Sequence, residues 1–189
     1  MRTFIAVRIG PTFELRRLRA KLVELGDRFR PVSLENLHLT LKFLGQTEPA
    51  QISAISSIVR QVAQNQPATA QHSIRVQLVG LGAFPHERRP AIVFAGFQQA
   101  ESLCQLAADL DRGLAPLGFA SEGKEFQPHL TLLRVKSRPP EALHSILAEE
   151  AETDFGIVEI SHVELIESEL TPRGSRYTTL AKFSLGPEN

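Results

Sequence analysis

The sequence predicts a fold of mixed strands and helices, built from two similar halves with a cleft between them. Short alternating apolar runs, typical of strands, are interleaved with segments in which apolar residues recur every three or four positions, as in amphipathic helices. The tetrapeptide HLTL occurs at 38–41 and again at 129–132, at the same place in a repeated order of elements. A duplicated unit usually packs against its twin about a pseudo-two-fold axis, so equivalent residues should face each other across one cleft.

The first half is predicted to run strand, helix, HLTL strand, helix, strand. The expected strands are 4–9, 37–44 and 74–84, and the expected helices are 12–25 and a segment from about 52 to a stop near Pro67. Glycine inside a strand often marks a bulge or a sharp bend. We therefore expect the third strand to be bent or bulged at Gly80 and Gly82.

The second half repeats this order and then adds a strand. We expect a strand at 91–97, a helix from 103 that ends by Gly118, a strand at 129–135, a short helix after Pro139-Pro140, a long strand at 157–170 and an extra strand at 177–185. Loops rich in glycine, proline or charge are expected beside the cleft at 84–90, 118–128 and 169–176. We predict a single domain over 1–189, with sequence repeats at about 1–85 and 90–170.

Composition limits the class of protein. Hydrophobic residues make up 42% of the chain, and its one cysteine, Cys104, excludes an internal disulfide framework and a thiolate metal cluster. The 21 basic and 21 acidic residues balance, which argues against a protein that coats duplex nucleic acid but allows a site for one or two phosphates. The start of the chain is predicted to be a strand rather than a signal peptide, and no stretch reaches the ~20 apolar residues of a membrane helix. We expect a soluble, cytoplasmic monomer with no membrane contact and no obligate protein partner.

The HLTL motif indicates acid–base chemistry on a phosphate. Residues two apart in a strand share a face, so His38 and Thr40 project together, and His129 and Thr131 do the same. A lone histidine in a strand is more often an ordinary surface residue, but two matched copies favour a function. One imidazole would take the proton of an attacking water, the other would protonate the leaving oxygen, and the threonine hydroxyls would donate to non-bridging phosphate oxygens. This chemistry requires no metal and no cofactor.

The two His-x-Thr motifs on twin halves closely resemble those of the two-histidine phosphoesterase superfamily. The resemblance is greatest to its bacterial and archaeal RNA 2',3'-cyclic phosphodiesterases, also called 2'-5' RNA ligases. The segments that look like family segments, in family order, are FIAVRI, LHLTLKFLG, LGAFPHERRP, PHLTLLR and LIESELTPRGSRYTTL. They span almost the whole chain. The resemblance implies a bilobal α+β fold in which antiparallel sheets, flanked by helices, surround the central cleft.

The resemblance also implies an activity: hydrolysis of RNA 2',3'-cyclic phosphate ends to 2'-phosphate ends without a metal. His38 would protonate the leaving 3'-oxygen, and His129 would accept a proton from water. The reverse reaction would join a 2',3'-cyclic phosphate end to a 5'-hydroxyl through a 2'-5' linkage, without ATP.

Three residues are candidates for substrate binding. Arg134 corresponds to a basic residue that often follows the second motif of the family and would contact phosphate. In an ideal strand Arg134 points away from His129, so it reaches the cleft only if the strand twists or ends by Leu133. Lys42, predicted on the face of His38, and Tyr177, beside a charged loop, are the other candidates. Further loop residues considered for RNA contacts are Phe84, Phe126, Arg88, Arg89, Arg173 and Arg176.

Other interpretations of the sequence remain open. A metal hydrolase lacks support because there is no His-Glu-x-x-His motif and no cysteine pair, and an ATP-dependent ligase would need a Lys-x-Asp-Gly or GxxxxGK pattern. The alternatives that stay are a phosphodiesterase for another cyclic nucleotide or for a 2'-5' linked oligonucleotide, and a non-catalytic RNA-binding module. The expected substrates are RNA ends or small cyclic phosphates.

Overall fold

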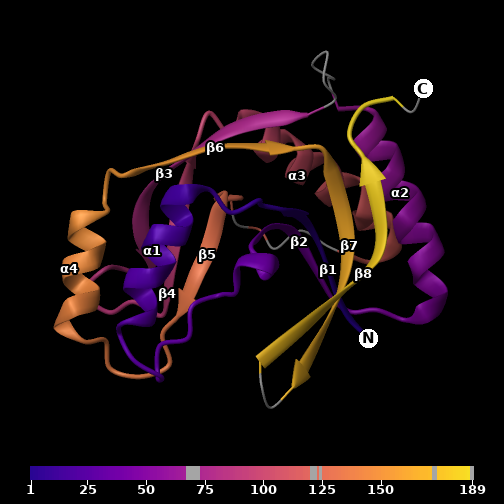
Figure 1. Cartoon of the computed structure of the whole chain (residues 1–189). Coiled ribbons are helices and arrows are strands. Elements are labelled where there is room, and N and C mark those ends of the chain that lie inside the picture. The colour runs from indigo at the N-terminus through magenta and orange to yellow at the C-terminus, as the bar shows by residue number, and fades with distance from the viewer. Residues whose placement is uncertain (67–72, 120–122, 124, 172–173, 188–189) are drawn as a thin grey trace.

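Two antiparallel sheets of four strands each organise the molecule (Figure 1). The computed structural model describes residues 1–66, 73–119, 123, 125–171 and 174–187. The first sheet has the order β2 (His38–Gln46), β1 (Arg2–Arg8), β7 (His162–Thr171) and β8 (Gly174–Ser184). The second has the order β5 (His129–Arg134), β4 (Ile92–Gln98), β3 (Ile74–Phe84) and β6 (Asp154–Ile160). The two HLTL motifs therefore begin the two edge strands β2 and β5.

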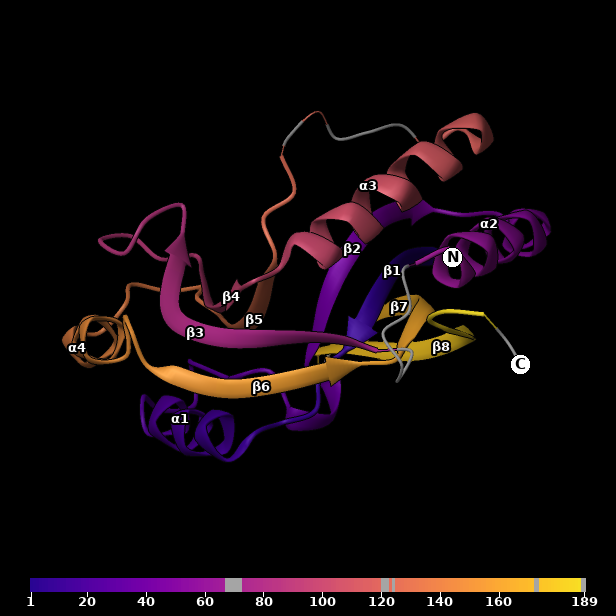
Figure 2. The same ribbon diagram turned by 90° about the horizontal axis from the view of Figure 1, so that it is seen from above.

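Four α-helices in the described part of the chain cover the sheets (Figures 1 and 2). Helices α2 (Ile52–Gln64) and α3 (Glu101–Leu114) pack against each other and against the first sheet, whereas α1 (Phe13–Val23) and α4 (Glu141–Glu149) pack beside the second. The same described residues include three short 3-10 helices, η1 (Leu34–Asn36), η2 (Pro49–Gln51) and η3 (Ala115–Leu117). The predicted α+β class with antiparallel sheets and flanking helices is confirmed.

The two sequence halves are interleaved in space. Both halves show the predicted order of strand, helix, HLTL strand, helix and strand. Strand β3 nevertheless leaves the first half to pair with β4 and β6 of the second, and β7 returns to pair with β1. Helix α1 contacts β6 and α3 contacts β2, so the helices are exchanged in the same way. Each sheet consequently contains elements from both halves.

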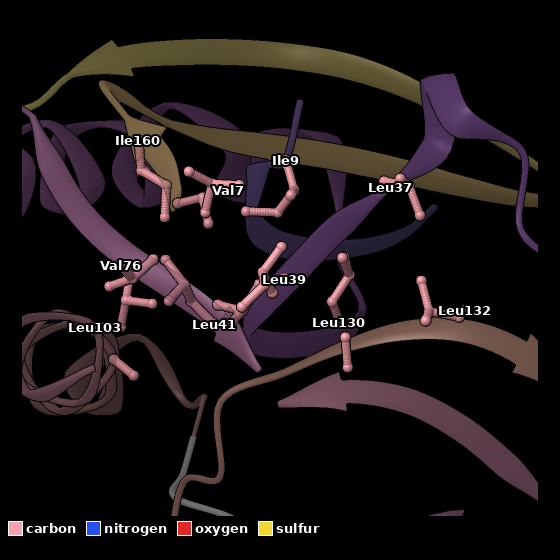
Figure 3. Close-up of a cluster of buried hydrophobic side chains, with 14 of the residues drawn as sticks. Val7, Ile9, Leu37, Leu39, Leu41, Val76, Leu103, Leu130, Leu132 and Ile160 are labelled. Carbon is pink, nitrogen blue, oxygen red and sulfur yellow. The ribbon is translucent and has the colours of Figure 1, made fainter. Parts of the chain in front are cut away.

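A shared apolar core lies between the two edge strands (Figure 3). Leu39 of β2 lies beside Leu130 of β5, while Leu132 lies toward Leu37 and Leu41 lies toward Val76 and Leu103, and all of these side chains are buried. The backbone between α1 and η1 joins this contact, because the Val32 N–H donates to the Leu132 carbonyl at 2.8 Å. The apolar residues of the two HLTL motifs thus hold the two sheets together along one seam.

The strand predicted at 157–170 is wrong as a single element. The chain forms β6 in the second sheet and β7 in the first, with a break at Ser161. The Ser161 carbonyl accepts from the Leu185 N–H at 2.9 Å instead of continuing a ladder. The alternation of buried residues slips by one position here, from Val158 and Ile160 to Val163, because the two strands bury their side chains against different sheets.

The loop predicted at 169–176 is also wrong. Strand β7 runs to Thr171 and β8 begins at Gly174, so most of this segment is a hairpin, which projects beyond the sheet in Figure 1. Two of its residues, 172–173, lie outside the described residues, as does part of the predicted loop at 118–128. Residues 85–91, between β3 and β4, do form the connection that was predicted there.

The bulge predicted at Gly80 is present. The register between β3 and β4 shifts between Val79 and Leu81, and Gly80 has a φ of +73°. Its N–H turns away to donate to the Thr153 carbonyl at 2.9 Å. A Cβ at this position would lie 2.4 Å from the carbonyl oxygen of Ala151. Both the backbone conformation and the close approach therefore require glycine.

We expect Gly80→Ala to lower the free energy of unfolding by about 2 kcal/mol or more, because it adds a strained left-handed backbone and a steric clash. Chemical denaturation followed by circular dichroism measures this loss. Gly10→Ala is the matched control, since a Cβ at Gly10 meets nothing within 4 Å. Equal stability of both variants would contradict the role assigned to Gly80.

Candidate active site

The two HLTL strands present histidine and threonine on the face opposite to the leucine core. His38 and Thr40 are half-buried, and so are His129 and Thr131, whereas the leucines between them are buried. We call these two surfaces the histidine faces of the first and second sheet. Among the described residues, neither threonine hydroxyl makes a hydrogen bond within the protein, so both are available to a ligand.

A matched β-bulge interrupts each motif after its threonine. In β2 the partners of Thr40 and Lys42 are the adjacent residues Ala6 and Ile5, so Leu41 is the extra residue. In β5 the partners of Thr131 and Leu133 are the adjacent residues Phe94 and Val93, so Leu132 is the extra residue. A bulge adds one residue and thereby reverses the facing of every side chain that follows it.

The bulge brings Arg134 to the histidine face of the second sheet. Leu132 and Leu133 are both buried, and the alternation resumes with Arg134 exposed, opposite Ile92. An ideal strand would have pointed Arg134 the other way, and the bulge supplies the change of direction that the prediction required. Its positive charge acts on His38 across the seam between the sheets.

The same bulge turns Lys42 away from the histidine, so the predicted placement of Lys42 on the face of His38 is wrong. Lys42 is only 7% exposed, and its ammonium group forms an ion pair with Asp111 of α3. Phe43 takes the position on the histidine face that corresponds to Arg134 in β5, and it is 58% exposed. Asp111 lies far from Lys42 in the sequence, so no local pattern indicates this ion pair. Strand alternation alone therefore predicted the wrong face for Lys42.

Both imidazole rings are held by the same backbone contact. Nδ1 of His38 lies 2.6 Å from the Asn36 carbonyl oxygen, and Nδ1 of His129 lies 2.8 Å from the Gln127 carbonyl oxygen. A carbonyl oxygen can only accept, so each Nδ1 carries a proton and donates it. Proton exchange with a substrate is thereby assigned to Nε2 of both rings.

Aromatic side chains support both histidines. The ring of His38 lies 5.2 Å from Phe4 and 5.1 Å from Tyr177, which are 5.5 Å from each other, by centroids. Tyr177 thus lies at the site where the sequence placed it, and its role in substrate binding stays a prediction.

The ring of His129 has an equivalent support. It lies 5.2 Å from Phe84 and 5.6 Å from Phe94, and these two rings stack at 4.4 Å. Phe94 lies directly over Gly82, where a Cβ would approach its ring to 2.6 Å. The second glycine singled out in the sequence therefore makes room for a ring that supports a histidine.

Burial and two positive charges lower the pKa of His38 from its ordinary value. Burial is the main cause, because it disfavours the imidazolium, and the charges of Arg8 and Arg134 act in the same direction. The hydrogen bond to Asn36 opposes them. Arg134 comes from β5, the strand that carries His129, and β5 packs against β2, the strand that carries His38.

Several residues at the site were not predicted from the sequence, namely Phe4, Arg8, Phe43, Phe94 and Glu164. The alternation in FIAVRI already places Phe4 and Arg8 on one face of the strand and Ile5 and Val7 on the other. What it lacks is any sign that β1 lies beside the histidine strand, which is a non-local property.

Of the other loop candidates, Phe84 is the one with a ring contact to a histidine in the described part of the chain. Phe84 supports His129 from β3, and Phe126 packs against the main core. Arg176 pairs with Glu169 at 3.5 Å, and Arg88 and Arg89 are exposed between β3 and β4. Arg173 lies outside the described residues.

The described part of the chain offers neither a metal cluster nor a membrane helix. No group of three or more histidine, cysteine, aspartate or glutamate side chains there is arranged to hold a metal ion. None of the helices there is both long enough and apolar enough to cross a membrane.

Comparison with known sequences finds relatives over almost the whole chain. The family model of the 2'-5' RNA ligase superfamily matches residues 14–171. A protein of Aeropyrum pernix named RNA 2',3'-cyclic phosphodiesterase is 35% identical over 169 residues, which are 88% of this chain and 92% of that protein. A protein of the same name from Methanothermobacter thermautotrophicus is 31% identical over 188 residues, which are 98% and 99% of the two chains.

Solved structures share the fold. The crystal structure of a protein from Thermus thermophilus has a TM-score of 0.78 and 32% identity over 100% of both chains. E. coli LigT complexed with ATP has a TM-score of 0.69 and 26% identity over 98% of both chains. The sequence match, the common fold and the paired histidine motifs agree, and the chain belongs to the 2'-5' RNA ligase superfamily of two-histidine phosphoesterases.

Proposed function

We propose that this protein hydrolyses RNA 2',3'-cyclic phosphate ends to 2'-phosphate ends by acid–base catalysis between His38 and His129, without a metal. Relatives that match most of the chain are named for this activity. The observation that carries the proposal is the pair of matched His-x-Thr motifs on β2 and β5, whose leucines share one core, with Arg134 on the histidine face of the second sheet. A phosphodiester anion is the natural ligand of such a site.

The reaction follows from the fixed rings. Nε2 of His129 accepts a proton from a water molecule, whose oxygen forms a bond to phosphorus. The bond from phosphorus to the 3'-oxygen breaks, and Nε2 of His38 delivers a proton to that oxygen. The hydroxyls of Thr40 and Thr131 donate to the two non-bridging oxygens, where negative charge increases in the transition state. The product is a 2'-phosphate and a 3'-hydroxyl.

His38 must carry a proton to serve as the donor, although its pKa in the free protein is lowered. A bound phosphodiester adds a negative charge beside Arg8 and Arg134 and so offsets the two charges that disfavour the imidazolium. The assignment of His38 as donor and His129 as acceptor therefore refers to the substrate complex. Two coupled histidines of this kind give a bell-shaped dependence of rate on pH.

Substrate binding divides between the two sheets in this proposal. Arg134 contacts the phosphate, and Tyr177 borders the histidine of the first sheet. The exposed ring of Phe43, 6.1 Å from Phe4, offers a flat apolar surface on which a base of single-stranded RNA can stack. Lys42 is not included, because its ion pair with Asp111 commits it to the core side of the sheet.

Microscopic reversibility extends the proposal to synthesis. The same groups with exchanged roles would join a 2',3'-cyclic phosphate end to a 5'-hydroxyl as a 2'-5' linkage. Other cyclic nucleotides and 2'-5' linked oligonucleotides suit the same chemistry and stay alternatives, as does RNA binding without catalysis. A cytoplasmic location and a monomeric state stay predictions from the sequence.

The first test is hydrolysis of a short RNA that ends in a 2',3'-cyclic phosphate, in excess EDTA, with the terminal phosphate of the product identified by phosphorus NMR. We expect conversion to a 2'-phosphate. His129→Ala should lower the rate by about 100-fold or more, because a positioned base contributes that much.

The matched control is His144→Ala, which removes a histidine from helix α4. It should retain wild-type activity. Activity that disappears in EDTA and returns with a divalent metal would contradict the proposal, and so would salt-dependent RNA binding without any product.

A second test separates the acid from the base. In a substrate whose leaving 3'-oxygen is replaced by sulfur, the departing thiolate needs no proton. We expect His38→Ala to lose about 100-fold or more on the oxygen substrate but much less on the sulfur substrate, whereas His129→Ala should lose activity on both. Steady-state rates with the two substrates provide the measurement, and the opposite pattern would exchange the roles of the two histidines.

A further inference from the structure

The two HLTL motifs are alike in the features that place their histidine and threonine. They share the tetrapeptide, the bulge, the carbonyl that holds Nδ1 and the pair of supporting aromatic rings. They differ in the residue directly opposite the histidine on the neighbouring strand. Arg8 of β1 is paired with His38, whereas Gly96 of β4 is paired with His129.

Arg8 is fixed in place by contacts on two sides. Its Nε donates to Glu164 Oε2 of β7 at 3.3 Å, and its terminal nitrogen donates to the Glu35 carbonyl of η1 at 2.9 Å. Glu164 is only 6% exposed and also accepts from the Thr179 hydroxyl of β8 at 2.8 Å. The guanidinium is therefore held beside the histidine by a buried carboxylate that is itself anchored.

The contact with Glu35 also bears on the geometry of His38. Asn36, the next residue of η1, supplies the carbonyl that accepts from Nδ1 of His38. Arg8 thus holds the backbone on which the orientation of the ring depends. Gly96 has only a hydrogen as its side chain, so no residue opposite His129 supplies the charge and the backbone contact that Arg8 supplies beside His38.

The charged and titratable groups around His38 come from several elements of the fold. Arg8 and Arg134 oppose its protonation. The carboxylate of Glu164 partly neutralises Arg8, since it forms an ion pair with it. The remaining groups are the Tyr177 hydroxyl on β8 and the Glu35 carboxylate on η1, beside Ser33 and Arg19.

We propose that Arg8 is a positioning residue that makes the two histidines unequal, because it fixes a positive charge and the backbone of η1 beside His38 and has no equivalent beside His129. This rests on the proposed function in one respect, the nature of the ligand. Binding of the phosphodiester is then coupled to proton uptake by His38. Identical motifs acquire different behaviour from the strand beside them rather than from their own sequence.

The test is a pH titration of the free protein, followed by the NMR signals of the histidine Cε1–H groups. In Arg8→Met the midpoint of His38 should rise by about half to one pH unit, as expected for removing one partly neutralised charge from the residue opposite His38. His129 should respond less, because Gly96 lies opposite it. In the dependence of kcat/KM on pH, the limb that reports the titration of His38 should move in the same direction.

Two further variants separate charge from structure. Arg8→Lys retains the positive charge but cannot reproduce both guanidinium hydrogen bonds, to Glu164 and to the Glu35 carbonyl. The midpoint of His38 in this variant should stay near that of the wild type. Arg75→Met removes an exposed strand arginine that pairs with Glu159 in the second sheet, and it should leave His38 unchanged. An unchanged midpoint in Arg8→Met, or an equal rise in Arg8→Lys, would overturn the proposal.

The NMR titration contains no substrate, so its outcome is independent of the catalytic activity. A rise in Arg8→Met in a protein without phosphodiesterase activity would support the role of Arg8 in setting the proton on His38 and remove only the proposed function. Full activity with an unchanged midpoint would remove only the role of Arg8.

Discussion

Burial of the HLTL leucines between the two edge strands is the constraint on which the site depends. Leu39 and Leu130 lie together in the seam between the sheets, and Leu41 and Leu132 belong to the same core (Figure 3). Because neighbouring residues of a strand point to opposite sides, fixing the leucines inward fixes each histidine and threonine outward. Packing is therefore the source of the precision with which the polar groups are placed. A one-residue slip of either strand would bury the histidine.

The bulges determine which residues after each motif point to the histidine faces. Each turns the residue after the buried pair, Phe43 in one strand and Arg134 in the other, onto a histidine face. We propose that the chain consists of two repeats, at about 1–85 and 90–170, within one domain. The matched bulges, ring contacts and element orders support this, and the interleaved sheets explain why the repeats do not fold as separate lobes.

Local patterns in the sequence predicted the elements and the two histidine–threonine pairs, because both depend on short-range periodicity. The change in alternation between Ile160 and Val163 is also visible in the sequence, and it marks the break between β6 and β7 that the single predicted strand did not include. The facing of Lys42 and Arg134 was not readable, because a bulge depends on the register with a neighbouring strand. The roles of Phe4, Arg8 and Phe94 likewise depend on which strands pair, a property that no local window contains.

The central claim is that both histidines act on one phosphate in one step. The most direct measurement is kcat/KM for the cyclic phosphate end with His38→Ala, His129→Ala and the double variant. Groups that act together in one transition state give losses that do not add, so the double variant should be only slightly slower than the slower single variant. Losses that multiply in full would contradict a shared step and would indicate that the two histidines act independently.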